Sequence, residues 1–333
     1  MIHSGHFKRI LLFALILLLI AGCGGGPTPT QVITETVAPE PTVTPTQTPP
    51  KALLIAPPEI ESTILQTKFN ELAVGSQLQA EIRPSLQPDE LSSDIMMVIF
   101  LVAPQDLNPY LSAAPQAQFL VVSSTELPQA ANLSVIRTRP EDQAFLSGYM
   151  SAILAPDWRA AALIPSGTPG ADNFQLAYTN GFYYYCGVCT VVNTPMISFP
   201  QIVSLPAGSD SAAWQSAVDA LRANFIFLAY IAPLAQSPEL ATGLAGGNLL
   251  LLGGQTPPDA VRARWAGTVQ FDLLTPIITL WPDLAAGKGG AAISAPLVVV
   301  DVNLQILTEG RMRLVKEMAD LLAKGKINTL NVP

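Results

Sequence analysis

Short apolar runs alternate along the chain with longer segments in which apolar residues recur at helical spacing. Residues 95–102 read IMMVIFLV, and residues 160–164 form a second uninterrupted run. Such runs are typical of strands that are covered on both faces of a sheet. Between them, Phe145, Tyr149 and Ile153 recur at i, i+4 and i+8, which places them on one face of a helix. This alternation predicts an α/β protein with mostly parallel sheets.

The alternation falls into two series, before and after residue 140. In the first series we expect strands at 52–56, 79–83, 95–102, 119–123 and 133–138, and helices at 59–72 and 106–113. In the second series we expect strands at 160–164, 190–193, 225–230, 249–252 and 297–302, and helices at 172–185, 210–223, 238–244, 271–285 and 309–324. Two such series predict two doubly wound lobes, and the chain is long enough to give each a core.

The segment 141–165 marks the crossing from one lobe into the other. It reads as an apolar helix, a turn and a buried strand. Pro140 suits the first helical turn, where Glu141 and Asp142 oppose the helix dipole. We assign residues 51–139 to an N-terminal lobe and 140–333 to a C-terminal lobe, with part of 270–333 returning to the N-terminal lobe.

The N-terminus reads as an export signal. Lys8 and Arg9 precede a 12-residue apolar run at 10–21, which is too short to span a membrane comfortably. The run ends in IAGC, which resembles the lipobox of bacterial lipoproteins and implies cleavage before Cys23 and lipid attachment to its sulfur. We therefore expect a signal peptide at 1–22 and a lipidated, Pro/Thr-rich tether at 23–50. The alternative is an ordinary secretory signal with a chance cysteine.

The composition narrows the class of protein. Hydrophobic residues make up 49% of the chain and charged residues 13%, which is too apolar for a disordered protein. The net charge of -8 argues against nucleic acid as a partner. Both histidines, His3 and His6, lie in the leader, which excludes Ser-His-Asp and Cys-His catalysis in the mature chain. We predict no enzyme activity, no metal and no cofactor.

Four stretches carry a resemblance to a known family. EDQAFLSGYMSAIL at 141–154, AAALIPSG at 160–167, YTNGFYYY at 178–185 and EMADLLAKGKINT at 317–329 resemble the basic membrane protein family of substrate-binding lipoproteins. The matching positions in the first and third stretches are Glu141, Asp142, Gln143, Gly148, Gly181 and Phe182. The resemblance implies a type I periplasmic-binding-protein fold, in which two lobes joined by a hinge with three crossovers hold a ligand in the cleft between them.

Two departures from the family pattern bear on the ligand. Members usually carry an aromatic-Asn pair after the first strand, where it helps to stack a nucleoside base, but residues 57–60 here read PPEI. The usual lysine near the late hinge is missing, since residues 270–272 read QFD. We therefore expect purine nucleosides to bind weakly or not at all, and a different small polar solute to bind better.

Ligands of open α/β sheets bind beyond the carboxyl ends of the strands. That rule selects the polar residues that follow the expected strands, although each of them is also an ordinary turn or capping residue. The candidates are Glu59, Gln105, Ser124, Thr168, Asn173, Tyr230, Gln255 and Asp272. Tyr230, which follows the run FIFLA, is the candidate for stacking on a ligand ring. We expect it to face the ligand together with the loop 166–173, opposite the loop 57–59.

Cys186 and Cys189 form a CxxC motif. A redox-active pair would open a helix, where the dipole lowers the thiol pKa, but this pair lies between an aromatic helix end and a strand. A metal site would need a second cluster of ligands, and the sequence has none. We expect a structural disulfide in an exported protein.

These observations predict a solute-binding lipoprotein on the outer face of the bacterial cytoplasmic membrane. It would close its two lobes around a small-molecule ligand, nucleoside-like or another polar solute, and deliver it to an ABC permease. One alternative is a degenerate family member that acts as a sensor or structural envelope lipoprotein without transporting a solute. A second is an envelope enzyme, for which the sequence offers no nucleophile motif.

Overall fold

The computed structural model describes residues 49–58, 60, 63–191, 197–220 and 224–331. The signal peptide, Cys23, nearly all of the tether and Glu59 lie outside these residues, so the expectations placed on them stay predictions. Among the helices in the described ranges, none combines the length and apolar character that a membrane crossing needs. The described side chains also include no group of three or more His, Cys, Asp or Glu residues arranged to hold a metal ion.

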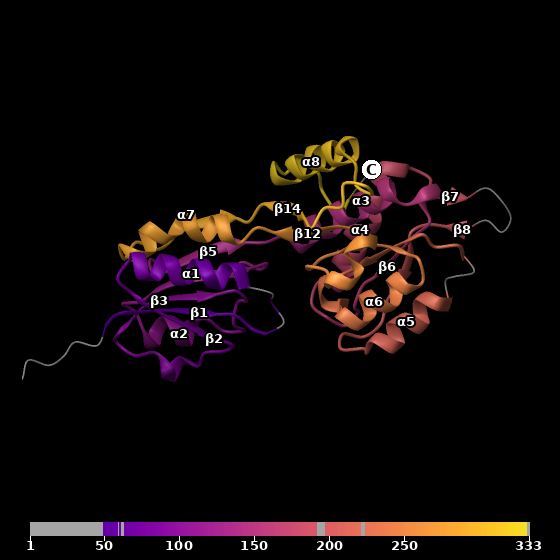
Figure 1. The fold of residues 1–333 in the computed structure, drawn as a ribbon. Coiled ribbons are helices and arrows are strands. Elements are labelled where there is room, and N and C mark those ends of the chain that lie inside the picture. Colours follow the sequence, from indigo (N-terminus) through magenta and orange to yellow (C-terminus); the bar gives the residue numbers. More distant parts are fainter. Residues whose placement is uncertain (1–48, 59, 61–62, 192–196, 221–223, 332–333) are drawn as a thin grey trace, which may run out of the picture. The chain divides into compact units, whose positions relative to one another are not determined.

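The first sheet has six parallel strands in the order β13-β5-β4-β3-β1-β2 (Figure 1). They are β1 (Lys51–Ile55), β2 (Gln79–Arg83), β3 (Ile95–Phe100), β4 (Gln118–Ser123), β5 (Leu133–Arg137) and β13 (Ala292–Ser294). Helices α1 (Thr63–Gly75) and α7 (Leu274–Ala285) cover one face, and the short helix α2 (Asn108–Ala113) lies on the other with the 3-10 turn η1 (Pro88–Glu90) near it.

The strands of this sheet are apolar on both faces because each face has its own core. Leu54 of β1 packs in the cluster that contains Phe69 of α1 and Trp281 of α7, whose rings meet edge to face with centroids 5.8 Å apart. Its neighbour Leu53 belongs to the opposite cluster, with Tyr110 of α2. Successive strand residues point to opposite faces, so an uninterrupted apolar run is what such a strand requires.

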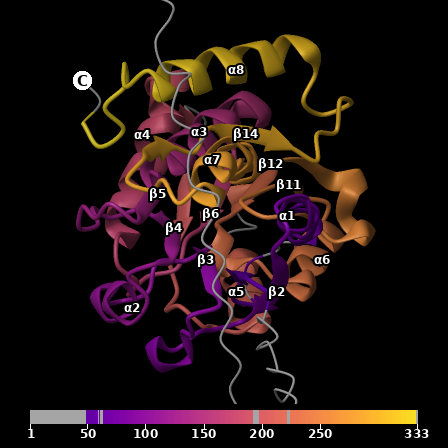
Figure 2. The ribbon, with the colours of Figure 1, turned by 90° about the vertical axis from the view of Figure 1, so that its left-hand side faces the viewer.

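The second sheet has the order β14-β12-β11-β10-β6-β9, and only β14 runs antiparallel to its neighbour. Its strands are β6 (Ala160–Leu163), β9 (Gln201–Val203), β10 (Leu228–Ile231), β11 (Leu250–Gly253), β12 (Trp265–Phe271) and β14 (Leu297–Val300). On one face lie α3 (Pro140–Leu154), α4 (Ala171–Cys186) and α8 (Glu309–Ala323), and on the other α5 (Ser211–Ala220) and α6 (Pro238–Gly246) (Figure 2). The remaining elements are the hairpin β7 (Thr190–Val191) and β8 (Ile197–Ser198) and the 3-10 turns η2 (Pro156–Trp158), η4 (Pro233–Ala235) and η5 (Asp259–Arg264).

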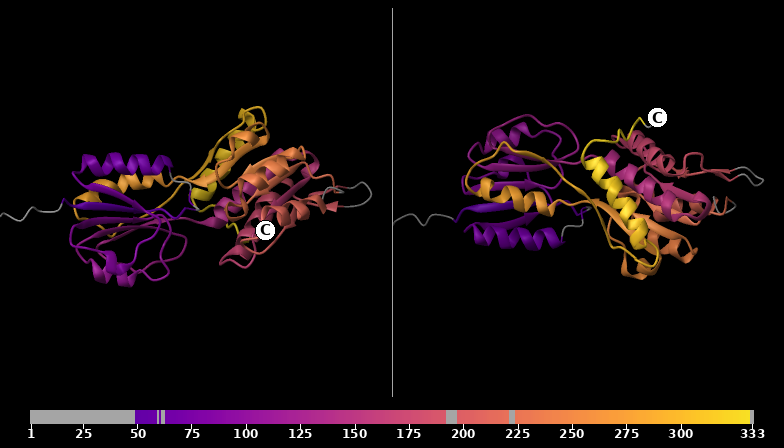
Figure 3. Two further views of the ribbon diagram at one scale, coloured as in Figure 1. Left: turned by 60° about the horizontal axis from the view of Figure 1, so that its bottom comes forward. Right: turned by 90° about the horizontal axis from the view of Figure 1, so that it is seen from above.

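The chain passes between the two sheets three times. It leaves the first sheet after β5 and enters α3, returns after β12 into α7 and β13, and leaves again after β13 into β14. In Figure 3 the orange late-chain helix α7 lies beside the indigo helix α1, over one face of the first sheet. Three crossovers are what the type I periplasmic-binding-protein fold requires, and the expected fold class, two doubly wound lobes with mostly parallel sheets, is confirmed.

Helices α3 and α4 pack against each other more closely than ordinary side chains allow. A Cβ atom added to Gly148 would lie 2.0 Å from the backbone oxygen of Tyr178, and one added to Gly181 would lie 1.9 Å from that of Phe145. Reciprocal glycines therefore let the two backbones touch. The tight contact fixes α3, whose first turn follows the first crossover, against the second lobe.

The strands differ from the expected ones in two main ways. The strand expected at 225–230 starts three residues later, because Phe225 has a φ of 55° and an exposed side chain. Strand β12, which precedes the second crossover, strand β13, which follows α7 in the first sheet, and the short strands β8 and β9 were not expected. Helix α3, expected as an apolar helix, is buried at every residue from Asp142 to Leu154.

The expected disulfide is present. Cys186 ends α4, and its sulfur is bonded to that of Cys189. Cys189 is 2% exposed in the core cluster that also contains Phe182 and Phe199. The disulfide therefore ties the end of α4 to the start of the β7–β8 hairpin, which is a structural role.

Candidate ligand-binding site

Two cavities open at the carboxyl ends of the parallel strands. The first, of about 380 Å³, is lined by residues that follow β4, β6 and β10 and by the first turns of α3 and α4. Its lining consists of Ser124, Thr125, Pro140, Glu141, Gln143, Ile164, Pro165, Thr168, Pro169, Gly170, Ala171, Phe174, Ala232, Pro233 and Leu234. Strands from both sheets contribute, as expected where ligands bind beyond strand ends in open α/β folds.

The second cavity, of about 590 Å³, lies next to the first. It is lined by the first turn of α1, by the segment that follows β11, by the second crossover and by two residues of β14. Its lining consists of Ile60, Thr63, Ile64, Leu65, Val122, Thr138, Gln143, Pro233, Gly254, Gln255, Thr256, Gln270, Phe271, Asp272, Leu273, Leu274, Val298 and Val300. Because Gln143 and Pro233 line both cavities, we treat the two as one crevice.

Gln143 holds its place by a buried hydrogen bond. Its Nε2 donates to the backbone oxygen of Val269 in β12 at 2.7 Å, and the residue is 6% exposed. This bond ties the first turn of α3, just after the first crossover, to the strand that leads into the second crossover. An amide that is buried and paired on one side is well placed to orient a polar ligand group with its other atom.

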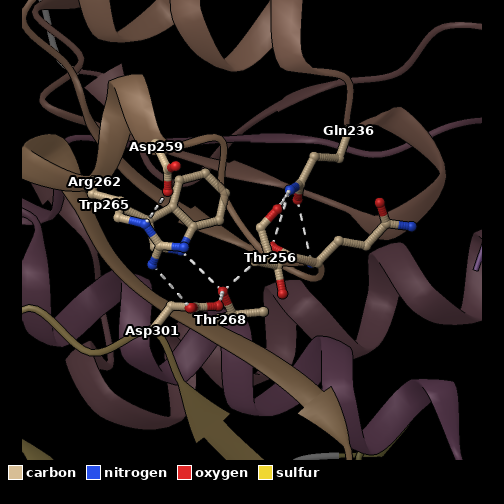
Figure 4. A network of polar contacts seen from close by, with 8 residues as sticks. Gln236, Thr256, Asp259, Arg262, Trp265, Thr268 and Asp301 are labelled. Atoms are coloured by element: carbon tan, nitrogen blue, oxygen red, sulfur yellow. Dashed lines mark hydrogen bonds and ion pairs between the residues drawn. The ribbon is translucent and has the colours of Figure 1, made fainter. Parts of the chain in front are cut away.

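A polar network fixes the loop between β11 and η5 at the crevice (Figure 4). The side chain of Gln236 donates to the backbone oxygens of Gln255 (2.9 Å) and Thr256 (3.0 Å) and accepts from the Gln255 N–H. The Thr268 hydroxyl accepts from the indole of Trp265 at 3.0 Å and bonds to Asp301 at 2.9 Å. The loop residues that line the crevice are therefore held by buried and half-buried bonds rather than left free.

Arg262, which is exposed to solvent, extends the polar network by binding two carboxylates. Its guanidinium bonds to Asp259 at 2.8 Å and to Asp301 at 3.2 Å, and these contacts raise its pKa. Asp301 adopts a φ of 50°, which a residue other than glycine rarely takes, so its two bonds hold a strained turn in place. This turn follows β14, of which Val300 lines the crevice.

Asp272 caps helix α7 at the second crossover. Its Oδ1 accepts from the N–H groups of Leu274 (3.0 Å) and Thr275 (3.1 Å), and its Oδ2 accepts from the Thr275 hydroxyl at 2.6 Å. Both carboxylate oxygens are thus engaged by the helix, which satisfies otherwise unpaired N–H groups. Asp272 lines the crevice, but its main role here is structural.

The structure brings four of the eight candidate residues to the crevice. Ser124 and Thr168 line the 380 Å³ cavity, and Gln255 and Asp272 line the 590 Å³ cavity. Gln105 and Asn173 are exposed and belong to the lining of neither, and Glu59 lies outside the described residues.

The expectation that Tyr230 faces the ligand was wrong. Tyr230 lies inside β10 with 0% exposure, and its ring stacks on that of Tyr178 with centroids 5.1 Å apart. Strand β10 runs on to Ile231, so Tyr230 lies within it, and its side chain packs in the core cluster of α3 and α4. It therefore packs the second lobe and does not reach a ligand, and the residues after β10 that line the crevice are Ala232, Pro233 and Leu234.

Several lining residues were missed by the sequence reasoning. Gln143 was noticed as part of a family-like motif but not as a site residue. Gln270 was missed because strand β12 was not recognised. Thr256 was missed because only Gln255 was selected from the loop that follows β11. Thr138 was placed inside the expected strand 133–138, whereas it directly follows the observed β5, so the strand-end rule that selected Ser124 did not select it.

Asp142 is a buried carboxyl beside the crevice. It is 7% exposed, its Oδ2 lies 3.3 Å from Arg139, and its Oδ1 has no hydrogen-bond partner among the described residues. Burial raises the pKa of the Asp142 carboxyl to about 6. The positive charge of Arg139 lowers this pKa, and the negative charge of Glu141 raises it. Since the folded-state pKa lies above the unfolded value, this group favours the folded state fully below about pH 4 and loses that contribution as the pH rises through 6.

Replacing Asp142 with asparagine is expected to stabilise the protein at pH 7.5 by about 1–3 kcal/mol and to change little at pH 4. The variant loses the ion pair with Arg139, whose half-exposed side chain makes that loss small. Urea unfolding of parent and variant at several pH values measures the difference. A difference that stays constant between pH 4 and 8 would contradict a raised pKa.

Comparison with known proteins supports the fold class. No protein-family model and no curated protein sequence matches the chain. Among solved structures, it is similar to an ABC transporter solute-binding protein from Conexibacter woesei, with 14% identity, 86% of this chain and 99% of that chain covered, and a TM-score of 0.63. It is also similar to an ABC transporter solute-binding protein from Aeropyrum pernix, with 12% identity, coverage of 84% and 93%, and a TM-score of 0.58.

The same fold also serves gene regulators. A LacI family transcriptional regulator from Enterococcus faecium, solved with bound ribose, matches with 11% identity, 75% of this chain and 97% of that chain covered, and a TM-score of 0.51. These similarities establish a type I periplasmic-binding-protein-like fold, shared by ABC transporter solute-binding proteins and LacI-like regulators. At sequence identities of 11% to 14%, these similarities show the fold and do not identify the ligand.

Proposed function

We propose that the chain is a solute-binding protein that captures a small molecule in the crevice and delivers it to an ABC importer. The observation that carries the proposal is the crevice itself, formed at the carboxyl ends of strands from both sheets and centred on Gln143 and Pro233. Three crossovers next to it allow the two lobes to close around a solute. No bond chemistry is required, and the three solved structures compared above are two solute-binding proteins and a regulator.

We also propose that the chain belongs to the basic membrane protein family. The support is the set of matching residues, of which Gly148 and Gly181 form the close contact between α3 and α4. Purine nucleosides are expected to bind weakly, because Pro57 and Pro58 stand where an aromatic residue would stack on the base. Loss of one stacking partner costs about 1–3 kcal/mol by analogy with nucleic-acid platforms.

The test of solute binding is mass spectrometry of the compounds that the purified, folded chain releases on denaturation. The proposal predicts one compound, enriched in proportion to the protein. A chain that stays folded and releases nothing, whether isolated from its own cells or exposed to their small-molecule extract, would favour the rival role as a sensor or structural lipoprotein.

Membrane anchoring through Cys23 is a separate proposal. Its support is the short apolar run followed by Ile20, Ala21 and Gly22 before the cysteine. Cys23→Ser is expected to leave the precursor unprocessed or to release the protein from membranes, as measured by its mobility and its partitioning into detergent. Processing and partitioning identical to the parent would show that Cys23 carries no anchor.

A further inference from the structure

The side chains that line the crevice carry no positive charge. Among its described lining residues none is Lys, Arg or His, whereas Glu141 and Asp272 are acidic. The neighbouring residues outside the described ranges, at positions 59, 61 and 62, are Glu, Glu and Ser in the sequence, so they add no cation. The crevice therefore offers acceptors and neutral donors, but no charged donor.

Two arginines near the crevice are paired with carboxylates. The Nη1 of Arg139, at the first crossover, lies 3.3 Å from Asp142, and Arg139 does not line the crevice. Arg262 is held between Asp259 and Asp301 on the far side of the polar network. Neither arginine is available to neutralise an anionic ligand group.

Three of the helix N-termini at the crevice carry a carboxylate of their own. Such ends attract anions through free N–H groups and the helix dipole. At α7, Oδ1 of Asp272 occupies the N–H groups of Leu274 and Thr275. Helix α3 carries Glu141 in its first turn and α4 carries Asp172 there. The first turn of α1, which also lines the crevice, has no acidic residue among its described positions, so an anion is disfavoured by the other three helices and by the lining side chains.

The crevice walls also expose apolar surface. Ile64 of α1 is 75% exposed and Leu234 after β10 is 67% exposed, and both line the crevice together with Phe271 and Phe174. Large apolar side chains left in contact with solvent beside a concave site indicate that the bound molecule covers them.

We infer that the solute captured by this crevice bears no negative charge and is an uncharged or cationic organic molecule with an apolar body. The inference rests on the proposed solute-binding function, and it specifies the substrate class of the same site. Phosphorylated sugars, nucleotides, dicarboxylates and inorganic anions are excluded, because a desolvated anion here would meet carboxylates and no compensating cation.

The charge of the crevice can be measured without knowing the solute. A single cysteine is placed in each cavity of the full chain, as Ser124→Cys and Thr256→Cys, and in a control position, as Gln129→Cys. Gln129 is exposed and lines a separate cavity of about 390 Å³ whose one charged lining residue is Arg137. Each thiol is treated with a cationic trimethylammonium methanethiosulfonate or an anionic sulfonate methanethiosulfonate of similar size, and labelling is followed by mass spectrometry on the peptide that carries the new cysteine.

The ratio of the cationic to the anionic labelling rate is expected to be at least about tenfold higher at Ser124→Cys and at Thr256→Cys than at Gln129→Cys, at low salt. Adding Glu141→Gln to Ser124→Cys should lower that ratio severalfold, while the Gln129→Cys ratio stays unchanged. Crevice ratios equal to or below that of the control would overturn the inference.

The identity of a retained solute provides an independent check. A phosphate, sulfate or carboxylate compound retained in stoichiometric amount would overturn the charge assignment and leave solute binding in place. A high labelling ratio in a chain that retains no compound would overturn the proposed function, while the measured charge of the crevice would stand.

Discussion

Replacing Gly148 with alanine is expected to destabilise the protein by about 3 kcal/mol or more, which is a large part of the stability of an ordinary domain. The new Cβ would lie 2.0 Å from the backbone oxygen of Tyr178 and 3.0 Å from the N–H nitrogen of Phe182. A flexible side chain could move aside, but these atoms belong to the backbone of α4. The backbones of α3 and α4 must therefore move apart, although α3 is packed against its surroundings on every side.

The matched control is Gly310→Ala, which makes the same substitution in α8. A Cβ there has no heavy atom within 4 Å, and its φ is not in the left-handed region. Alanine forms helix better than glycine, so this variant is expected to be unchanged or more stable by about 0.5–1 kcal/mol. Chemical denaturation followed by circular dichroism measures both variants. Equal stabilities of Gly148→Ala and Gly310→Ala would show that α3 and α4 do not touch in the way described.

The sequence predicts the fold class well because buried strands and helix caps are local features. The runs at 95–102 and 160–164 became β3 and β6, and the series boundary near residue 140 became the first crossover. Helix α3 was expected as an apolar helix, but the burial of its polar residues could not be predicted from the sequence. Its Gln143, Ser147 and Ser151 look polar in sequence, yet all three are buried, and their side chains bond to Val269 of β12 or to carbonyls one turn earlier in α3.

The misplaced Tyr230 shows how a strand boundary can misdirect a site prediction. The run from Phe225 to Tyr230 is apolar throughout, so periodicity gives no sign that its first residues lie outside the sheet. In the structure, Arg159 lies over the ring of Phe225 at 5.5 Å, and Leu228 begins the strand. The strand also continues to Ile231, so the tyrosine lies one residue before its end, with its side chain in the core.

The crevice as a whole depends on contacts that no local pattern reveals. Thr256 and Gln270 reach it because β12 lies between β11 and β14, and the polar network of Trp265, Thr268 and Asp301 joins residues far apart in the chain. Neither the register of a sheet nor a bond such as that from Gln143 to Val269 can be read from spacing. The sequence therefore predicted the edge of the sheet where the site lies, but of the seven candidates among the described residues only four line the crevice.

Replacing Thr256 with tryptophan is expected to reduce the retention of solute at least about tenfold. Thr256 lines the 590 Å³ cavity, and its backbone is held by Gln236 independently of its side chain. The larger side chain occupies part of the volume that the solute needs, and each tenfold loss in affinity corresponds to about 1.4 kcal/mol. The fold should tolerate the change because the side chain points from a half-exposed loop.

Gln129→Trp serves as the control for this change. It places the same bulky side chain in the separate cavity of about 390 Å³ that Arg137 and Leu133 line. Solute retention by this variant should equal that of the parent, and both variants should unfold at the parent's temperature in the absence of solute.

Native mass spectrometry of the parent, Thr256→Trp and Gln129→Trp tests the location of the site most directly, because it counts solute molecules on the folded chain. The structure predicts one bound small molecule on the parent and on Gln129→Trp, and a largely empty Thr256→Trp. Equal occupancy of all three proteins would place the solute outside the crevice, and a parent that carries no solute even after exposure to the small-molecule extract of its own cells would contradict solute capture altogether.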